Sequence, residues 1–143
     1  MLVSQILKAK GDAVFTISRK TLISDAAATL GAKSIGALVI TDGKKGVVGI
    51  LSERDIVRAL GDRGAGCLSD SVEALMTPDP FCAGLGDTGE EVLSRMTEGR
   101  FRHMPVLKDG ELVGIVTLGD LVKARLEELA MENASMQGMI MGH

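Results

Sequence analysis

Aromatic residues are almost missing from the sequence, which has three Phe and no Trp or Tyr among 143 residues. Proteins that bind single-stranded nucleic acid stack the bases on aromatic side chains, and nucleic-acid-binding surfaces carry an excess of Lys and Arg. Here 16 Lys and Arg stand against 19 Asp and Glu, for a formal net charge of −3. The composition therefore argues against a nucleic-acid partner, and it predicts a core of aliphatic residues and Met.

Cysteine and long apolar runs are scarce as well. Cys67 and Cys82 show none of the Cys and His spacings of zinc sites, and two cysteines are too few for a disulfide framework. No run of about 18 apolar residues is present, which argues against a membrane-spanning helix. The N-terminal residues MLVSQILKAKGD lack the apolar region of a signal peptide. We therefore expect a cytoplasmic protein with no metal site and no membrane partner.

What the sequence does contain is an internal repeat. Residues 47–57, VVGILSERDIV, resemble residues 112–122, LVGIVTLGDLV, and residues 36–43, GALVITDG, resemble residues 103–110, HMPVLKDG. Two further pairs of segments match upstream in the same order. A length difference of two residues falls in a Gly-rich turn, where it is well tolerated. The matches indicate a duplicated unit of about 65 residues.

Each copy predicts the same succession of a short helix, a strand, a helix, two strands and a helix. We assign residues 1–62 to the first unit with its lead-in helix, 63–71 to a linker, 72–130 to the second unit, and 131–143 to the end of the last helix and the tail. One such unit is only marginally stable alone, whereas two units packed sheet to sheet bury a shared core. The sequence therefore predicts an α/β (α+β) fold of two pseudo-symmetric units, each a small mixed sheet with helices on one face. Between the units we expect a cleft.

The pattern G-x-x-[S/T]-x-x-D occurs once in each copy, where a strand leads into a helix. Ser52 precedes Asp55 in the first copy, and Thr117 precedes Asp120 in the second. A hydroxyl at a helix N-terminus suits a phosphate, and a carboxylate on the first helical turn suits the paired hydroxyls of a ribose. The same residues also cap helices without any ligand. Because the pattern occurs twice, each time after an apolar hairpin, we favour a nucleotide site.

In these motifs the sequence resembles a pair of cystathionine-β-synthase (CBS) domains, which together form a Bateman module. The matching segments are GILSERD (49–55), GIVTLGD (114–120), IGALVI (35–40) and RHMPV (102–106), and the resemblance covers about residues 2–130. More narrowly, the chain is similar to small stand-alone bacterial proteins that contain this pair and no catalytic domain. The resemblance implies a sensor of adenosine-containing ligands, namely AMP, ADP, ATP, NAD(H) or S-adenosylmethionine.

The resemblance and the basic residues near the motifs assign three groups of residues to the ligand. The ribose and the adjoining phosphate would meet Ser52, Asp55, Thr117 and Asp120. The adenine ring would be framed by the backbone around Thr16, Ile17, Ala37, Met104 and Pro105. The phosphates would meet the basic side chains of Lys10, Arg54, Arg58, Arg102 and His103. In the alternative, the arginines pair with acidic residues on a solvated helix face, His103 is simply packed, and Lys10 is exposed to solvent.

Two functions stay open at this point. The first is a non-enzymatic regulatory or signalling module that binds an adenine nucleotide or dinucleotide (AMP, ATP or NAD(H)) and acts on an effector protein. The second is a dimeric protein-interaction module whose ligand pocket is vestigial. The resemblance also implies a homodimer, formed through the apolar sides of the helices at residues 55–60 and 120–129. An enzyme is disfavoured, because the sequence offers no P-loop, GxGxxG fingerprint or nucleophile with a suitably spaced base.

Overall fold

The computed structural model describes residues 1–43 and 46–140, with side chains as far as residue 135. The elements of the first half are α1 (Val3–Lys10), β1 (Thr16–Ser18), α2 (Ile23–Lys33), β2 (Ala37–Thr41), β3 (Val47–Ser52) and α3 (Glu53–Arg63). Two short 3-10 helices follow, η1 (Gly64–Ser69) and η2 (Val72–Ala74). The second half contains β4 (Thr77–Pro78), β5 (Ala83–Gly84), α4 (Gly89–Gly99), β6 (His103–Lys108), β7 (Glu111–Thr117) and α5 (Leu118–Ile140).

The two halves have the same sheet topology. In the first, β1 pairs in parallel with β2, which pairs antiparallel with β3; in the second, β5, β6 and β7 are arranged in the same way. In the antiparallel pairs, Gly49 lies opposite Ile40 and its equivalent Gly114 lies opposite Val106. The first sheet gains a fourth strand, β4, which pairs with β3. The duplication seen in the sequence is therefore a duplication of structure.

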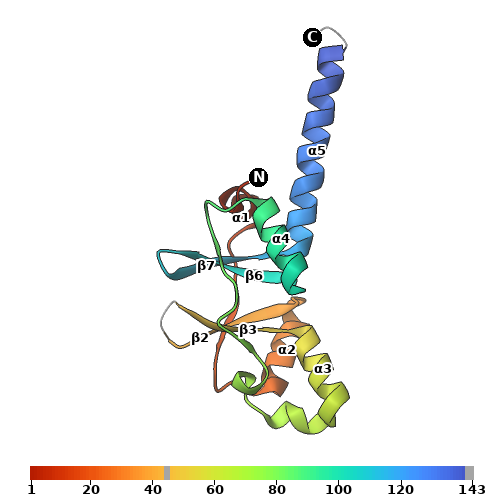
Figure 1. Ribbon diagram of the computed structural model, residues 1–143. Coiled ribbons are helices and arrows are strands. Elements are labelled where there is room, and N and C mark those ends of the chain that lie inside the picture. Colours follow the sequence, from red (N-terminus) through yellow and green to blue (C-terminus); the bar gives the residue numbers. More distant parts are fainter. Residues whose placement is uncertain (44–45, 141–143) are drawn as a thin grey trace.

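The two sheets lie together in the middle of the molecule, with helices on their outer sides (Figure 1). The helices α2 and α3 flank the first sheet, and α1, α4 and α5 flank the second (Figure 1). This arrangement confirms the predicted fold of two pseudo-symmetric units, each a small mixed sheet with helices on one face. Beyond the second unit, α5 continues away from the body as a long single helix (Figure 1).

Each sheet has its own apolar core, and the lead-in segments are exchanged between the two cores. Val3, Ile6 and Leu7 of α1 come before the first unit in the chain, but they are buried in the core of the second. Val72 of η2 begins the second unit in the chain, but it is buried in the core of the first. A buried aliphatic side chain contributes roughly 1.5–3 kcal/mol relative to exposure, so the exchange ties the two units together.

Two glycines at equivalent places make room for the exchanged segments. A Cβ on Gly114 of β7 would lie 2.9 Å from Leu7 Cδ2, and a Cβ on Gly49 of β3 would collide with Met76 Sδ. Gly49 and Gly114 are 65 residues apart, and they are the glycines that open the repeated G-x-x-[S/T]-x-x-D pattern. At both places the side chain of the exchanged segment occupies the space that a Cβ on the strand would take, so a larger residue would force Leu7 or Met76 to move.

Among the residues that the structure describes, no helix combines the length and the hydropathy needed to cross a membrane. The cysteines are free thiols, with Cys67 buried and Cys82 partly buried. The cytoplasmic location stays a prediction of the sequence.

Candidate functional site

Both copies of the repeated pattern form a cap at a strand-to-helix junction. In the first unit, Asp55 Oδ2 accepts hydrogen bonds from Ser52 N at 2.8 Å and from Ser52 Oγ at 3.1 Å. In the second, Asp120 Oδ2 accepts from Thr117 N at 2.8 Å, and Asp120 N donates to Thr117 Oγ1 at 3.1 Å. The capping interpretation is therefore correct for both pairs. It leaves the other carboxylate oxygen of each Asp without a hydrogen bond from any described residue, so a cap and a ligand site are compatible.

A cleft of about 1080 Å³ lies between the two units, at the upper end of the volumes that small-molecule sites have. It is lined from the first unit by the start of α3 and from the second by the loop before β6 and the start of α5. Seven of the predicted site residues meet there: Ser52, Arg54, Asp55, Arg58, Arg102, His103 and Thr117. Residues that are up to 65 positions apart in the sequence thus share one site.

The other predicted residues do not line this cleft. Thr16 and Ile17 belong to β1, while Ala37, Met104 and Pro105 are buried in β2 and β6. Their role in framing an adenine ring stays a prediction. Lys10 and Asp120 lie together elsewhere, and they contact each other.

Lys10 reaches from the end of α1 to the motif of the second unit. Its Nζ donates to Asp120 Oδ2 at 2.6 Å and to the backbone oxygen of Ile115 at 2.9 Å. Both side chains of this ion pair are partly shielded, with 27% of the Lys10 side chain and 21% of the Asp120 side chain exposed. The proposed ribose carboxylate of the second unit is therefore already bonded to a cation, whereas among the described residues Asp55 is bonded only to Ser52.

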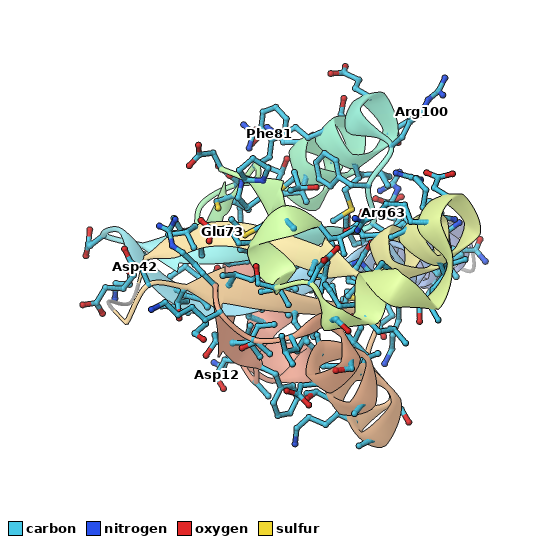
Figure 2. The ribbon with its side chains drawn as sticks, turned by 90° about the horizontal axis from the view of Figure 1, so that it is seen from below. Asp12, Asp42, Arg63, Glu73, Phe81 and Arg100 are labelled. Atoms are coloured by element: carbon cyan, nitrogen blue, oxygen red, sulfur yellow. The ribbon has the colours of Figure 1, made fainter. Side chains whose placement is uncertain are left out.

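The cleft carries more positive than negative charge. The cationic side chains that line it are Arg54, Arg58, Arg100, Arg102 and Lys123, and the acidic ones are Glu53, Asp55 and Asp79. Within residues 1–43 and 46–135, none of these five cations takes part in an ion pair. Figure 2 shows one of them, Arg100, at the end of α4 and directed away from the ribbon. A gathering of unpaired guanidinium groups favours an anionic ligand, above all a phosphate.

His103 belongs to the second unit but lies against the backbone of the first. A Cβ on Gly36 would come within 2.9 Å of His103 Nε2, so the imidazole occupies the space that a side chain would need there. Burial lowers the pKa of His103, and the nearby Glu53 carboxylate opposes this shift without cancelling it. At neutral pH the imidazole is therefore uncharged, and the positive charge of the cleft comes from the arginines and the lysine.

Comparison with known proteins agrees with this architecture. The model of the CBS domain family matches residues 5–62 and again residues 72–127. The chain belongs to the CBS domain family. The CBS-domain containing protein ATU1752 from Agrobacterium tumefaciens is similar in structure, with a TM-score of 0.84 and 42% sequence identity. The match covers 87% of this chain and 99% of that one, so the neighbour is a stand-alone CBS pair.

Two other solved CBS structures contain adenosine compounds. The CBS domain protein PAE2072 from Pyrobaculum aerophilum is complexed with AMP; it is 28% identical with a TM-score of 0.79, over 92% of this chain and 99% of that one. The CBS domain pair of MJ0100 is in complex with 5′-methylthioadenosine and S-adenosyl-L-methionine; it is 27% identical with a TM-score of 0.79, over 90% of this chain and 98% of that one. By contrast, this chain spans only 23% of the longer CBS domain-containing protein CBSCBSPB2 of Arabidopsis thaliana, with 29% identity over 124 residues.

Several residues that line the cleft between the CBS units were not predicted from the sequence. Lys123 could have been found, because it lies 65 residues after Arg58 and takes the same place in the second unit. Arg100 belongs to no motif and ends α4 in the left-handed conformation, with φ of 56°. Phe81 and Phe101 stack with ring centroids 5.9 Å apart and planes within 10°, and both line the cleft. Nothing in their spacing indicates that they meet.

Proposed function

We propose that this CBS pair is a non-enzymatic regulatory module that binds an adenine nucleotide in the cleft between its units. The observation that carries the proposal is a single cleft that joins the Asp55 carboxylate to five unpaired cations from both units. A carboxylate accepts hydrogen bonds from ribose hydroxyls, and cations attract phosphates. The AMP complex of PAE2072 supports an adenosine-containing ligand.

The charge of the cleft supports a phosphorylated ligand over a sulfonium compound. S-Adenosylmethionine carries a positive sulfonium group, which the surplus of cations in the cleft repels. AMP, ATP and NAD(H) are anions. ATP and NAD(H) have several phosphates that reach cations of both units, and they suit the cleft better than AMP.

The proposed roles follow from the geometry. The Oδ1 atom of Asp55 takes a ribose hydroxyl, because its Oδ2 atom is bonded to Ser52. Arg54 and Arg58, one helical turn apart on α3, bind phosphate from the first unit, and Arg102 binds phosphate from the second.

The other residues predicted from the sequence have these proposed roles. Thr117 and His103 add neutral hydrogen-bonding groups to the wall of the cleft formed by the second unit. The family resemblance assigns the adenine ring to the backbone around Thr16, Ile17, Ala37, Met104 and Pro105, which adjoins the cleft lining only in the chain and does not itself line the cleft. The stacked Phe81 and Phe101 add an apolar wall to the cleft. Asp120 takes the place in the second unit that Asp55 takes in the first, and there it is bonded to Lys10.

The proposed mechanism is linkage between ligand binding and the arrangement of the CBS units. A ligand that touches both walls of the cleft stabilises the arrangement in which both walls fit it. It shifts the equilibrium by no more than its difference in affinity for the two arrangements. An effector protein that contacts both units reads this shift.

A homodimer is part of the proposal. Val57 and Leu60 on α3 and Val122, Leu126 and Leu129 on α5 are exposed apolar side chains, and Val57 and Val122 are equivalent residues of the two units. A face built from two equivalent helices is nearly self-complementary, as a two-fold interface between identical chains requires. The alternative function, a dimeric interaction module with a vestigial pocket, rests on this same face.

Thermal unfolding with a panel of ligands tests the proposal. Circular dichroism is the suitable signal, because the chain has no Trp or Tyr. Binding to the folded state alone adds roughly 2.7 kcal/mol when the ligand is at about 100 times its Kd. We expect ATP, AMP or NADH, but not S-adenosylmethionine, to raise the midpoint.

The matched pair of variants is Asp55→Asn, which loses the shift, and Asp62→Asn, which keeps it. Asp62 is an exposed carboxylate on the same helix and lies outside the cleft. If no ligand shifts the midpoint, the nucleotide function is wrong and the interaction module is favoured.

A further inference from the structure

The exchanged lead-in segments, α1 and the segment that begins with η2, allow the surroundings of the two G-x-x-[S/T]-x-x-D motifs to be compared residue by residue. Leu7 packs against Gly114 of the second unit, and Met76 packs against Gly49 of the first. Since Gly49 and Gly114 are equivalent, Leu7 and Met76 occupy equivalent places on the two lead-ins. Three residues after Leu7 comes Lys10, and three residues after Met76 comes Asp79.

Lys10 and Asp79 are therefore equivalent residues of opposite charge, and their surroundings differ accordingly. In the first unit, Asp79, Asp55 and Ile50 all line the open cleft. In the second, the equivalents of Asp55 and Ile50 are Asp120 and Ile115, and both accept a hydrogen bond from Lys10. The groups that face open space in the first unit are thus covered by one lysine in the second.

We infer that Lys10 closes the second of two equivalent nucleotide sites, so that the chain binds one nucleotide, at Asp55. The inference rests on the proposed function. Lys10 holds Asp120 Oδ2 at 2.6 Å in a partly shielded ion pair and also covers the Ile115 carbonyl. A ribose that approaches the remaining oxygen of Asp120 must therefore share the carboxylate with the ammonium group or displace it. Asp55 has no cation to displace, so its site fills first.

Lys10 is in this view a specificity-determining residue that distinguishes between two sites of the same chain. Its effect is local, because the α1 side chains that hold the lead-in in place, Val3, Ile6 and Leu7, are buried independently of the lysine. Removing the ammonium group therefore opens the second site without undocking α1. The carboxylate of Asp120 keeps its bond from Thr117 N and stays in position for a ribose.

The test is the stoichiometry of ATP binding by isothermal titration calorimetry. We expect the wild type to bind one ATP per chain, with binding lost in Asp55→Asn and retained in Asp120→Asn. Lys10→Ala is expected to bind two. The double variant Lys10→Ala with Asp55→Asn should bind one ATP, at Asp120. Adding Asp120→Asn to this double variant should abolish that binding.

The control is Lys108→Ala, which removes an exposed lysine at the end of β6 that lies away from His103 and the cleft. This variant should bind one ATP per chain, like the wild type. Circular dichroism establishes that each variant is folded. The inference is overturned if the wild type binds two ATP, if Asp120→Asn abolishes its binding, or if Lys10→Ala still binds only one. Absence of binding of ATP, AMP and NADH in the wild type and in every variant overturns the proposed function as well, so the two failures can be told apart.

Discussion

Replacing Arg58 by Gln removes one cation of the cleft and keeps most of the side-chain length. Arg58 lies on α3, one turn after Arg54 and on the helix that begins beside Asp55. It forms no ion pair with a described residue, so the substitution breaks none. We therefore expect a loss of nucleotide affinity without a loss of stability.

The size of the loss follows from the exposure of the residue. A hydrogen bond to a charged group contributes roughly 1.5–3 kcal/mol, and an open cleft places Arg58 at the lower end of this range. A loss of about 1.5 kcal/mol raises the Kd for ATP about tenfold. AMP should lose less, because its single phosphate engages fewer of the cations.

Titration calorimetry with ATP and with AMP measures the change in Kd for each nucleotide. Repeating it in ~0.1 M and ~1 M salt, where the Debye length falls from about 10 Å to about 3 Å, should show a weaker salt dependence in Arg58→Gln. The matched control is Arg19→Gln, which removes the same charge from the first unit at a residue that pairs with Glu73 outside the cleft. Equal losses in both variants would mean that only net charge matters. No loss in Arg58→Gln would refute the assignment of the arginines to phosphate.

Three further predictions concern the fold, the assembly and pH. Gly114→Ala should lower the free energy of unfolding in urea by about 1–3 kcal/mol, because the new Cβ would meet Leu7. The control Gly61→Ala on α3, where the new Cβ has open space around it, should leave the free energy unchanged or raise it by up to about 1 kcal/mol. Equal effects of the two variants would contradict the packing argument. Leu126→Asp should convert the proposed dimer to a monomer in sedimentation velocity, and an unchanged dimer would exclude this face. Because burial lowers the pKa of His103 in the folded state, the unfolded chain binds the proton more tightly, so stability should fall as the pH drops below about 6.5 and stay level above it. His103→Gln should remove this part of the pH dependence of urea unfolding, and an identical profile would show that other groups cause it.

The duplication made most of the fold predictable. The matches between residues 36–57 and 103–122 predicted both hairpins and both strand-to-helix junctions. Their register was one residue out, because Gly49 lies opposite Ile40 whereas its equivalent Gly114 lies opposite Val106, the match of Val39. The exchange of the lead-ins could not be predicted. The spacing of Val3, Ile6 and Leu7 shows that one face of α1 is buried, but the same face would fit either core. The ion pair of Lys10 with Asp120 depends on this exchange, so it could not be predicted from the sequence either.

Some residues of the candidate site could likewise be predicted from the repeated motif, and others could not. The repeated motif brought Ser52, Asp55 and Thr117 to one cleft, because a strand that leads directly into a helix fixes where the motif lies. The remaining walls come from loops. Arg100 and Phe81 line the cleft because of how α4 and the β4–β5 connection are placed, and a sequence pattern carries no information about such placement.

The exchange of the lead-ins also constrains how a ligand can act on the proposed module. The chain crosses between the units after α1 and again after β4, so the units cannot separate without pulling a buried segment out of a core. On the proposed mechanism, the movement that remains is a small shift of α3 relative to α5, the two helices whose first turns line the cleft. The same helices carry Val57 and Val122 of the proposed dimer face. A nucleotide held between them therefore changes the spacing of that face, and ATP should shift the monomer–dimer equilibrium of the wild type. Asp55→Asn should abolish this shift in sedimentation velocity, and a shift that persists in the variant would separate dimerisation from the cleft.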